Sequence, residues 1–321
     1  MPRWRLAGTV LIWRRILLLA TVLLTMLAVA DLEITHEQPL FRYLAVVDIT
    51  QSMNVSDAGV AQERRLDFAV QALRAMLTGL PCGSELGLAL FAANRSFLLL
   101  TPVDICQHFH ELNQVLNWLD WRLAWASYSE VAKGLYSALL ATRELAGNAR
   151  LLFLTDGHEA PPVNPKFRPV FNKGKPGEVD GLIVGIGGDI PQPIPQLDMR
   201  GKVTGYWRAD DVLQIDVYSL GRNSSTGSTE TMVGVDDSNI AERIKNGTEH
   251  LSSLRESYLR QLASETALDY YRLDSINDWL NRLQDPNLAE WREAPLSTTG
   301  LAGLLALLLL SLEAVLAWRR G

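Results

Sequence analysis

The stretch that most restricts the fold of this chain is a short apolar run, Leu44 to Val47, that ends on the carboxylate of Asp48. A run of this kind without polar alternation is typical of a strand buried in a parallel sheet. In open α/β sheets, ligands bind just beyond the carboxyl ends of such strands. Asp48, Thr50 and Ser52 therefore offer three hard oxygen atoms from one loop, which suits Mg²⁺ or Ca²⁺.

A second apolar strand of the same type, residues 151–154, leads into Thr155-Asp156-Gly157. Each acidic residue taken alone is consistent with an ordinary strand end or helix cap. Two acidic strand ends in one α/β domain, together with the alternating hydroxyl residues, favour a divalent-cation site. His158 follows directly, but a single loop histidine is usually solvated, and we do not expect it to be a ligand.

The order of the expected elements predicts an α/β fold. Strands and helices alternate along the chain, which indicates a doubly wound, mostly parallel six-stranded sheet with helices on both faces. A hairpin, residues 85–92 and 96–103, supplies one antiparallel edge strand. Helices are expected at residues 63–80, 107–119, 130–145 and 254–266, and further strands at 150–155, 179–187 and 270–273.

Residues 188–250 interrupt this order, and we interpret them as an insertion in a domain that covers residues 40–275. The insertion contains three prolines within five residues, 191–195, and a Gly/Ser/Thr-rich run. Two short strands are expected in it, at residues 202–207 and 212–218, and residues 224–228 are expected to be mobile. Residues 276–298 are expected to form a short helix and a linker.

Both ends of the chain are apolar and are flanked by arginines. Residues 1–30 are expected to be an uncleaved signal anchor or a removed signal peptide, and residues 299–318 a transmembrane helix. The flanking arginines place both ends in the cytoplasm and the domain between them in the periplasm, at a bacterial inner membrane. Of the 30 basic and 36 acidic residues, six basic and one acidic lie in the two ends, which leaves a net charge of −11 on residues 31–296. Such a domain binds nucleic acid poorly.

The chain has two cysteines, Cys82 and Cys106, and they flank the predicted hairpin. A hairpin brings the start of its first strand close to the end of its second. Because an exported domain is in an oxidising compartment, we expect a Cys82–Cys106 disulfide. Two buried free thiols are the alternative.

Asp48-x-Thr50-x-Ser52, with Asp156 at a later strand end, resembles the metal-ion-dependent adhesion site (MIDAS) of von Willebrand factor A (vWA) domains. The family pattern has Ser where this chain has Thr50, and that exchange keeps the hydroxyl. The family also supplies a separate Thr before a helix, and the resemblance places Ser129 at that position, with Ser127 as the alternative. The resemblance covers about residues 40–275. It implies a non-enzymatic binding module that holds Mg²⁺, or else Ca²⁺ or Mn²⁺.

By this resemblance, the ion keeps an open position that captures a carboxylate from a protein client. Residues 48–54 and 250–255 look most similar to MxaL-type proteins of methanol-oxidation gene clusters, within the membrane-anchored branch that accompanies MoxR-type AAA ATPases. The implied role is maturation of, or metal insertion into, a periplasmic enzyme such as methanol dehydrogenase. Trp125 and Tyr128 are candidate aromatic contacts at the rim of the site, although a core position is equally consistent with either.

Two other functions fit parts of the sequence. The first is a structural scaffold without a metal ion, in a membrane chaperone or stress complex of the Bat type. The second is an Asp-dependent phosphohydrolase, which needs a second Asp where this chain has Thr50. The sequence also lacks a Gly-rich phosphate loop ending in Lys-Ser/Thr. We therefore do not expect an enzyme.

Overall fold

The computed structural model describes residues 3–30, 33–163, 168–212, 214, 247–297 and 299–318. The chain divides into two compact units. One unit, Leu40–Ala289, contains the central sheet, and the other consists of the two ends, Met1–Pro39 and Glu290–Gly321.

The central sheet has six strands in the order β13-β8-β7-β2-β5-β6. The strands are β2 (Arg42–Asp48), β5 (Glu85–Ala92), β6 (Arg95–Asp104), β7 (Arg150–Thr155), β8 (Gly181–Gly185) and β13 (Asp269–Arg272). All neighbouring pairs are parallel except β5 and β6, which are antiparallel. The chain builds the sheet outward from β2 in one direction and then from β7 in the other, which is the doubly wound order. The predicted fold class is confirmed for this unit.

Strand β2 lies in the middle of the sheet, between β5 and β7. Tyr43, Ala45 and Val47 belong to the core on one face of the sheet, and Leu44 and Val46 belong to the core on the other. Every residue of the strand after Arg42 is buried. Because both faces are covered, the strand has to be apolar at successive positions, and this is why its sequence shows no alternation.

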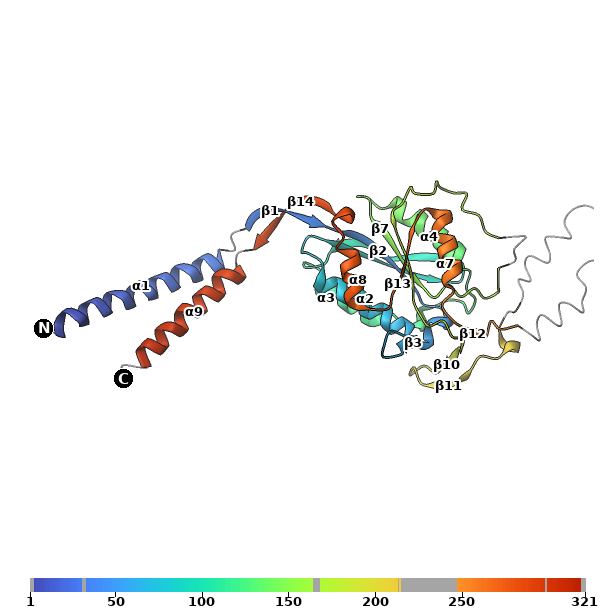
Figure 1. The fold of residues 1–321 in the computed structure, drawn as a ribbon, viewed down its shortest axis with the longest axis horizontal. Helices are drawn as coiled ribbons and strands as arrows, with labels where there is room; N and C mark the ends of the chain where they lie inside the picture. Colours follow the sequence, from blue (N-terminus) through green and yellow to red (C-terminus); the bar gives the residue numbers. More distant parts are fainter. Residues whose placement is uncertain are drawn as a thin grey trace, which may run out of the picture. The chain divides into compact units, whose positions relative to one another are not determined.

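Two sets of helices cover the sheet (Figure 1). The first core includes buried residues of α2 (Arg65–Gly79), α3 (Phe109–Trp118) and α8 (Ile276–Leu283). The second includes those of α4 (Val131–Glu144) and α7 (Glu256–Thr266). In α2, Leu66, Val70, Leu73 and Leu77 recur at helical spacing and are all buried. This apolar stripe is the reason that the segment forms a helix against the sheet.

The hairpin of β5 and β6 forms as expected from the sequence. Ala93, at its turn, has a positive φ of 57°. Cys82 precedes β5 and Cys106 follows β6, and the structure joins the two in a disulfide with 5.3 Å between their Cα atoms. The bond closes the hairpin at the end opposite the turn.

Within residues 188–250, the described part forms short antiparallel pairs. Strand β9 (Gln192–Pro193) pairs with β12 (Leu251–Ser252), and β10 (Pro195–Leu197) pairs with β11 (Val203–Tyr206). A 3₁₀ turn, η4 (Ala209–Asp211), follows β11. The strand expected at residues 212–218 and the mobile run expected at 224–228 lie largely or wholly outside the described residues.

The domain extends beyond the predicted boundary at residue 275. Helix α8 is the short helix expected after that boundary, and its Trp279 and Leu283 are fully buried in the core. The Trp279 indole N–H also donates to the carbonyl oxygen of Ala72 in α2, at 3.2 Å. The short helix expected within residues 276–298 therefore forms, but it belongs to the domain, because its amphipathic side completes one face of the sheet.

The unit formed by the two ends contains two long helices and two paired strands. Helix α1 (Arg3–Val29) and helix α9 (Thr299–Trp318) pack against each other, and β1 (Glu33–Leu40) pairs with β14 (Glu290–Ser297). Among the residues described, no helix is both long enough and apolar enough to cross a membrane. The membrane segments predicted for residues 1–30 and 299–318 are thus not supported by the structure.

Candidate metal centre

The two acidic strand ends lie at the point where the strand order of the sheet reverses. Strands β2 and β7 are parallel neighbours, with Val47 opposite Leu154. The next residues, Asp48 and Thr155, are in contact: the Thr155 hydroxyl donates to Asp48 Oδ2 at 2.6 Å. Asp156 follows immediately. Ligands of doubly wound sheets bind at this reversal point, so the fold itself places both carboxylates where a ligand would bind.

The loop after β2 brings its hydroxyl groups to Asp48. Both the backbone N–H and the hydroxyl of Thr50 donate to Asp48 Oδ1, at 2.9 and 2.7 Å. Thr50 Oγ1 lies 3.3 Å from Ser52 Oγ. Thr50 also precedes the short 3₁₀ helix η1 (Gln51–Asn54), which turns the chain back over the strand end. The alternating spacing therefore places the carboxylate and both hydroxyls together.

Ser129 comes from a different part of the chain and reaches the same site. Its backbone exchanges two hydrogen bonds with Ala160, at 2.8 and 2.9 Å, and the next residue, Glu130, donates to the carbonyl oxygen of Ala93. These bonds fix Ser129 between the loops that follow β5 and β7. Its side chain is 3% exposed, and its Oγ has no hydrogen-bond partner among the described residues. A buried hydroxyl without a partner is costly unless a ligand satisfies it.

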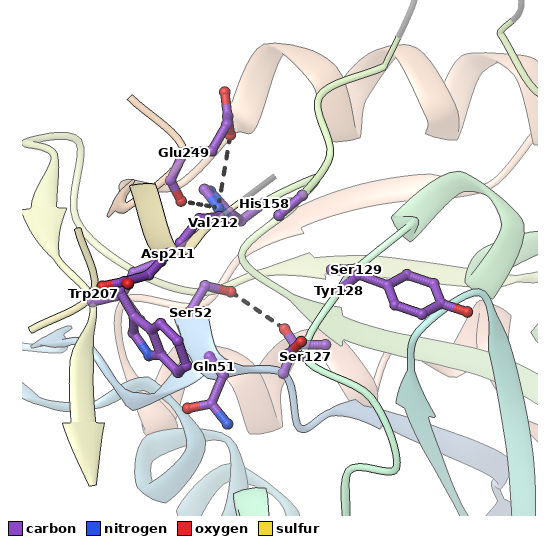
Figure 2. Close-up of a pocket in the computed structure, with 13 residues that line it drawn as sticks. Gln51, Ser52, Ser127, Tyr128, Ser129, His158, Trp207, Asp211, Val212 and Glu249 are labelled. Carbon is purple, nitrogen blue, oxygen red and sulfur yellow. Dashed lines mark hydrogen bonds and ion pairs between the residues drawn. The ribbon is translucent and has the colours of Figure 1, made fainter. Parts of the chain in front are cut away.

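A cleft lies over these groups (Figure 2). Thr50, Ser52 and Ser129 line it, together with Ser127, and its interior volume is about 80 Å³. The 127–129 segment forms one wall, the side chains of Trp207, Asp211, His158 and Glu249 lie on the opposite side, and Gln51 and Ser52 lie between the two. The hydroxyl groups of the candidate site therefore face a space large enough for an ion, its waters and a small part of a partner.

A buried arginine lies next to the second carboxylate. Arg65, the first residue of α2, is fully buried, and its Nη1 lies 2.5 Å from Asp156 Oδ2. Its Nε and Nη2 donate to the two carboxylate oxygens of Asp57, both at 2.7 Å. Ser252 in β12 accepts from Nη1 through its hydroxyl and from Nη2 through its carbonyl oxygen. One guanidinium group thus connects β7, β12 and the small β3–β4 hairpin (Ser56–Ala58 and Glu63–Arg64).

Gly187 leaves the room that Arg65 needs. It follows β8 with a φ of +127°, a conformation that side chains rarely adopt. A Cβ atom at this position would lie 2.6 Å from Arg65 Nε. Glycine is therefore required here both by the backbone conformation and by the space that the guanidinium group occupies.

The two carboxylates differ in their protonation. Burial and the charge of Asp156 raise the pKa of Asp48 to about 7, against the hydrogen bonds from Thr155 and Thr50. Burial also disfavours ionised Asp156, but the charge of Arg65 beside it outweighs this and holds its pKa below the usual range. The difference follows from geometry, because Arg65 contacts Asp156 and does not contact Asp48. Within the described ranges of the chain, Asp48 is thus the carboxylate that lacks a cation.

The donor set fits a hard divalent cation. Three hydroxyl groups, those of Thr50, Ser52 and Ser129, line one cleft, and the hydroxyl of Ser129 has no partner among the described residues. Asp48, directly behind Thr50, would supply negative charge. Both oxygens of Asp156 already accept hydrogen bonds, from Arg65 and from the His158 N–H, so this residue would act through water. The described residues contain no cluster of three His, Cys, Asp or Glu side chains with metal-binding geometry. Hydroxyl groups, rather than further acidic side chains, would complete the coordination shell of the ion.

Two sequence-based expectations at the site require revision. His158 is not a solvated loop residue: it is 2% exposed, and its Nε2 lies 3.1 Å from the carbonyl oxygen of Glu249. Trp125 is half exposed and is not among the residues that line the cleft. Tyr128 lines the cleft, but its ring points away from Ser52 (Figure 2).

Arg65, Asp57 and Ser252 were not predicted from the sequence to be parts of the site. One signal was present for Arg65. The positive end of the helix dipole repels a cation in the first turn of a helix. A cation at that position therefore indicates an anionic partner outside the helix. No local pattern distinguishes Asp57 or Ser252 from ordinary loop residues, because their roles depend on where distant segments meet.

Comparisons with known proteins concern the fold. No protein-family profile and no curated protein matches this sequence. Similar solved structures include an aerotolerance-related membrane protein from Bacteroides fragilis, with 16% identity, a TM-score of 0.47, and coverage of 77% of this chain and 98% of that one. BatB from Bacteroides thetaiotaomicron has 15% identity, a TM-score of 0.47, and coverage of 77% and 97%. A von Willebrand factor type A protein from Catenulispora acidiphila has 9% identity, a TM-score of 0.35, and coverage of 78% and 42%. At these values the likenesses carry no argument about function.

Proposed function

We propose that this protein is a non-enzymatic binding module that holds a divalent cation, Mg²⁺ in the first instance, and uses it to bind an acidic side chain of a protein client. Thr50, Ser52 and Ser129 supply hydroxyl ligands, Asp48 supplies negative charge, and Asp156 acts through water. The observation that carries the proposal is the buried Ser129 hydroxyl, which has no partner in the described part of the chain and lines the same cleft as Thr50 and Ser52. Because few of these ligands carry a charge, the ion would stay positive enough to attract a client carboxylate.

The experiment is thermal unfolding of the 321-residue chain in EDTA and then with Mg²⁺, Ca²⁺ or Mn²⁺. Binding of an ion to the folded state stabilises it by about 2.7 kcal/mol at a hundredfold excess over Kd. The rise in Tm should vanish in Asp48→Asn, which keeps the shape of the side chain but removes its charge. The matched control is Asp67→Asn, an exposed acid on α2 that pairs with Arg64. The control should retain the full rise.

One observation favours a second function, that of a scaffold without a metal ion. Arg65 already supplies a cation to Asp156, fully buried and at 2.5 Å. In that case the domain holds an assembly together through its surface alone, as in a Bat-type complex. An unchanged Tm with all three ions would overturn the metal proposal and leave the scaffold as the leading function.

The compartment and the client are also proposals. The Cys82–Cys106 disulfide supports an oxidising compartment, in agreement with a periplasmic domain of an inner-membrane protein. Because of the resemblance in the sequence, methanol dehydrogenase is the first client to test, and a MoxR-type AAA ATPase is a further partner. Binding of purified methanol dehydrogenase should depend on Mg²⁺ and be lost in Asp48→Asn. Binding that is equal in EDTA would show that a different surface is used.

A further inference from the structure

The wall of the cleft opposite Ser129 carries polar and aromatic side chains that the proposed metal site does not use. It is formed by side chains of Trp207 and Asp211, from the segment that follows β11, and by His158 and Glu249 (Figure 2). The described residues that line the cleft include two carboxylates, those of Asp211 and Glu249, and neither lysine nor arginine. Among the described residues, Glu249 forms an ion pair with Arg255, whose Nη2 lies 3.8 Å from Glu249 Oε2, and His158 Nε2 lies 3.7 Å from the same oxygen. This wall therefore carries excess negative charge.

His158 adds an unused hydrogen-bond acceptor to this wall. Its Nε2 contacts the carbonyl oxygen of Glu249, which can only accept, so Nε2 carries the hydrogen. Nδ1 of the neutral ring is then an acceptor, and it has no partner among the described residues although the side chain is 2% exposed. A buried acceptor of this kind indicates a ligand that donates hydrogen bonds.

Trp207 contributes an aromatic surface and one donor. Its backbone N–H donates to the carbonyl oxygen of Ile194, at 3.0 Å, which fixes its position beside the cleft. Its indole N–H is buried and has no acceptor among the described residues. An indole ring beside carboxylates attracts a cation to its face, and its N–H can satisfy a peptide carbonyl oxygen.

From these groups we infer that the cleft has a second subsite, formed by Trp207, Asp211, His158 and Glu249, which takes a basic side chain of a protein client. A lysine ammonium or arginine guanidinium only donates hydrogen bonds, which matches the two carboxylates and His158 Nδ1. This inference rests on the proposed function in one respect, that the occupant is a protein. It specifies a client that presents an acidic and a basic side chain close together, the first to the cation and the second to this wall.

The test uses the 321-residue chain in EDTA, so that the cation site does not contribute. The probes are the blocked peptide Ac-Gly-Lys-Gly-NH₂ and the same peptide with Nε-acetyl-lysine, which is nearly the same shape but neutral. Titration calorimetry should show that the lysine peptide binds at least about tenfold more tightly than the acetylated one, since one buried charge interaction is worth at least that factor.

Variants then locate the binding. Glu249→Gln and Asp211→Asn should each weaken binding of the lysine peptide several-fold, whereas Asp210→Asn should not. Asp210 is the adjacent acid and is exposed, as Asp211 is, but it does not line the cleft. Equal binding of the two peptides, or no loss in Glu249→Gln when thermal unfolding shows it folded, would overturn the subsite. Failure of the metal proposal gives a different result, the absence of a Tm rise with Mg²⁺ while the lysine peptide still binds in EDTA.

Discussion

Arg65 Nη1 lies 2.5 Å from Asp156 Oδ2, and both side chains are completely removed from solvent. The two residues are 91 positions apart in the chain. The same guanidinium holds Asp57 through two hydrogen bonds of 2.7 Å. A buried cation thus lies between two carboxylates directly beneath the candidate ion site. It keeps Asp156 ionised and leaves Asp48 as the carboxylate whose charge is not balanced.

Replacing Arg65 should strongly destabilise the fold. In Arg65→Met, Asp57 and Asp156 would remain buried without a cation, and the loss of one partner of a buried ion pair costs about 3–5 kcal/mol. The free energy of unfolding from urea denaturation measures this loss. The control is Arg64→Met, which removes a partly exposed pair with Asp67 and should cost less than about 1 kcal/mol. Similar losses in the two variants would contradict a structural role for the Arg65 cluster.

Gly187→Ala should displace Arg65 without removing it. The new Cβ would lie 2.6 Å from Arg65 Nε, at a residue with a φ of +127°. We expect a loss of more than about 2 kcal/mol, since backbone strain adds to the disturbance of the ion pair. Gly201→Ala is the matched control, because Gly201 also has a positive φ but open space around its Cβ position. It should cost about 1–2 kcal/mol, from the left-handed conformation alone. A loss in Gly187→Ala no greater than in Gly201→Ala would mean that Arg65 moves aside freely.

Ser129→Ala should separate ion binding from stability. In EDTA the free energy of unfolding should stay within about 0.5 kcal/mol of the wild type, because the hydroxyl that is removed has no partner among the described residues. The Kd for Mg²⁺, obtained from the dependence of Tm on ion concentration, should rise about tenfold, which corresponds to 1.4 kcal/mol. Ser127→Ala, at the exposed alternative position, should leave the Kd unchanged. The reverse pattern would assign the loop ligand to Ser127.

Glu159 should make stability depend on pH. Its carboxylate accepts hydrogen bonds from the N–H of Ala132 and the hydroxyl of Tyr258, but burial prevails and raises its pKa to about 7. Because the unfolded chain releases this proton near pH 4.5, the free energy of unfolding falls as pH rises from about 4.5 to 7, by about 3 kcal/mol. Below pH 4.5 this contribution is fully present.

Glu159→Gln should remove that part of the slope. Asp48, with a pKa near 7, adds a slope of the same sign, and His158, whose pKa burial lowers to about 4, adds the opposite sign between pH 6.5 and 4. The measurement is therefore the difference between wild type and variant in urea denaturation from pH 4 to 8. Glu144→Gln, at the exposed end of α4, should leave the slope unchanged. A Glu159→Gln slope identical to the wild type would show that Glu159 is ionised in the folded state.

The Cys82–Cys106 disulfide should stabilise the β5–β6 hairpin. The residues are 24 apart in the sequence, and closing a loop of this length is worth about 3 kcal/mol in the chain-entropy description. The double variant Cys82→Ser, Cys106→Ser should lose about this amount in urea denaturation. Dithiothreitol should lower the stability of the wild type to a similar level and leave the variant unchanged. An equal effect of the reductant on both proteins would indicate that the bond does not form in solution.

The sheet could be predicted from the sequence because its signals are local. The apolar run of β2 and the helical stripe of α2 each identify an element from a few neighbouring residues. The hydroxyl spacing after Asp48 is also a local signal, because Thr50 and Ser52 lie within four residues of the strand end, in the turn that leads into and forms η1. Helix α8 was also expected, but its place in the core was not, because its amphipathic pattern is compatible with either a core or a surface position.

The pairing of distant charges could not be predicted in the same way. Arg65 meets Asp156, and His158 meets Glu249 91 residues later, only after the loops at the carboxyl ends of the strands have converged. Local pattern is sufficient for secondary structure and strand ends, because backbone geometry repeats every two or 3.6 residues. Which carboxylate keeps a cation, and which hydroxyl stays unpaired, depends on distances between segments that share no pattern. These were decided by the packing of the chain in three dimensions.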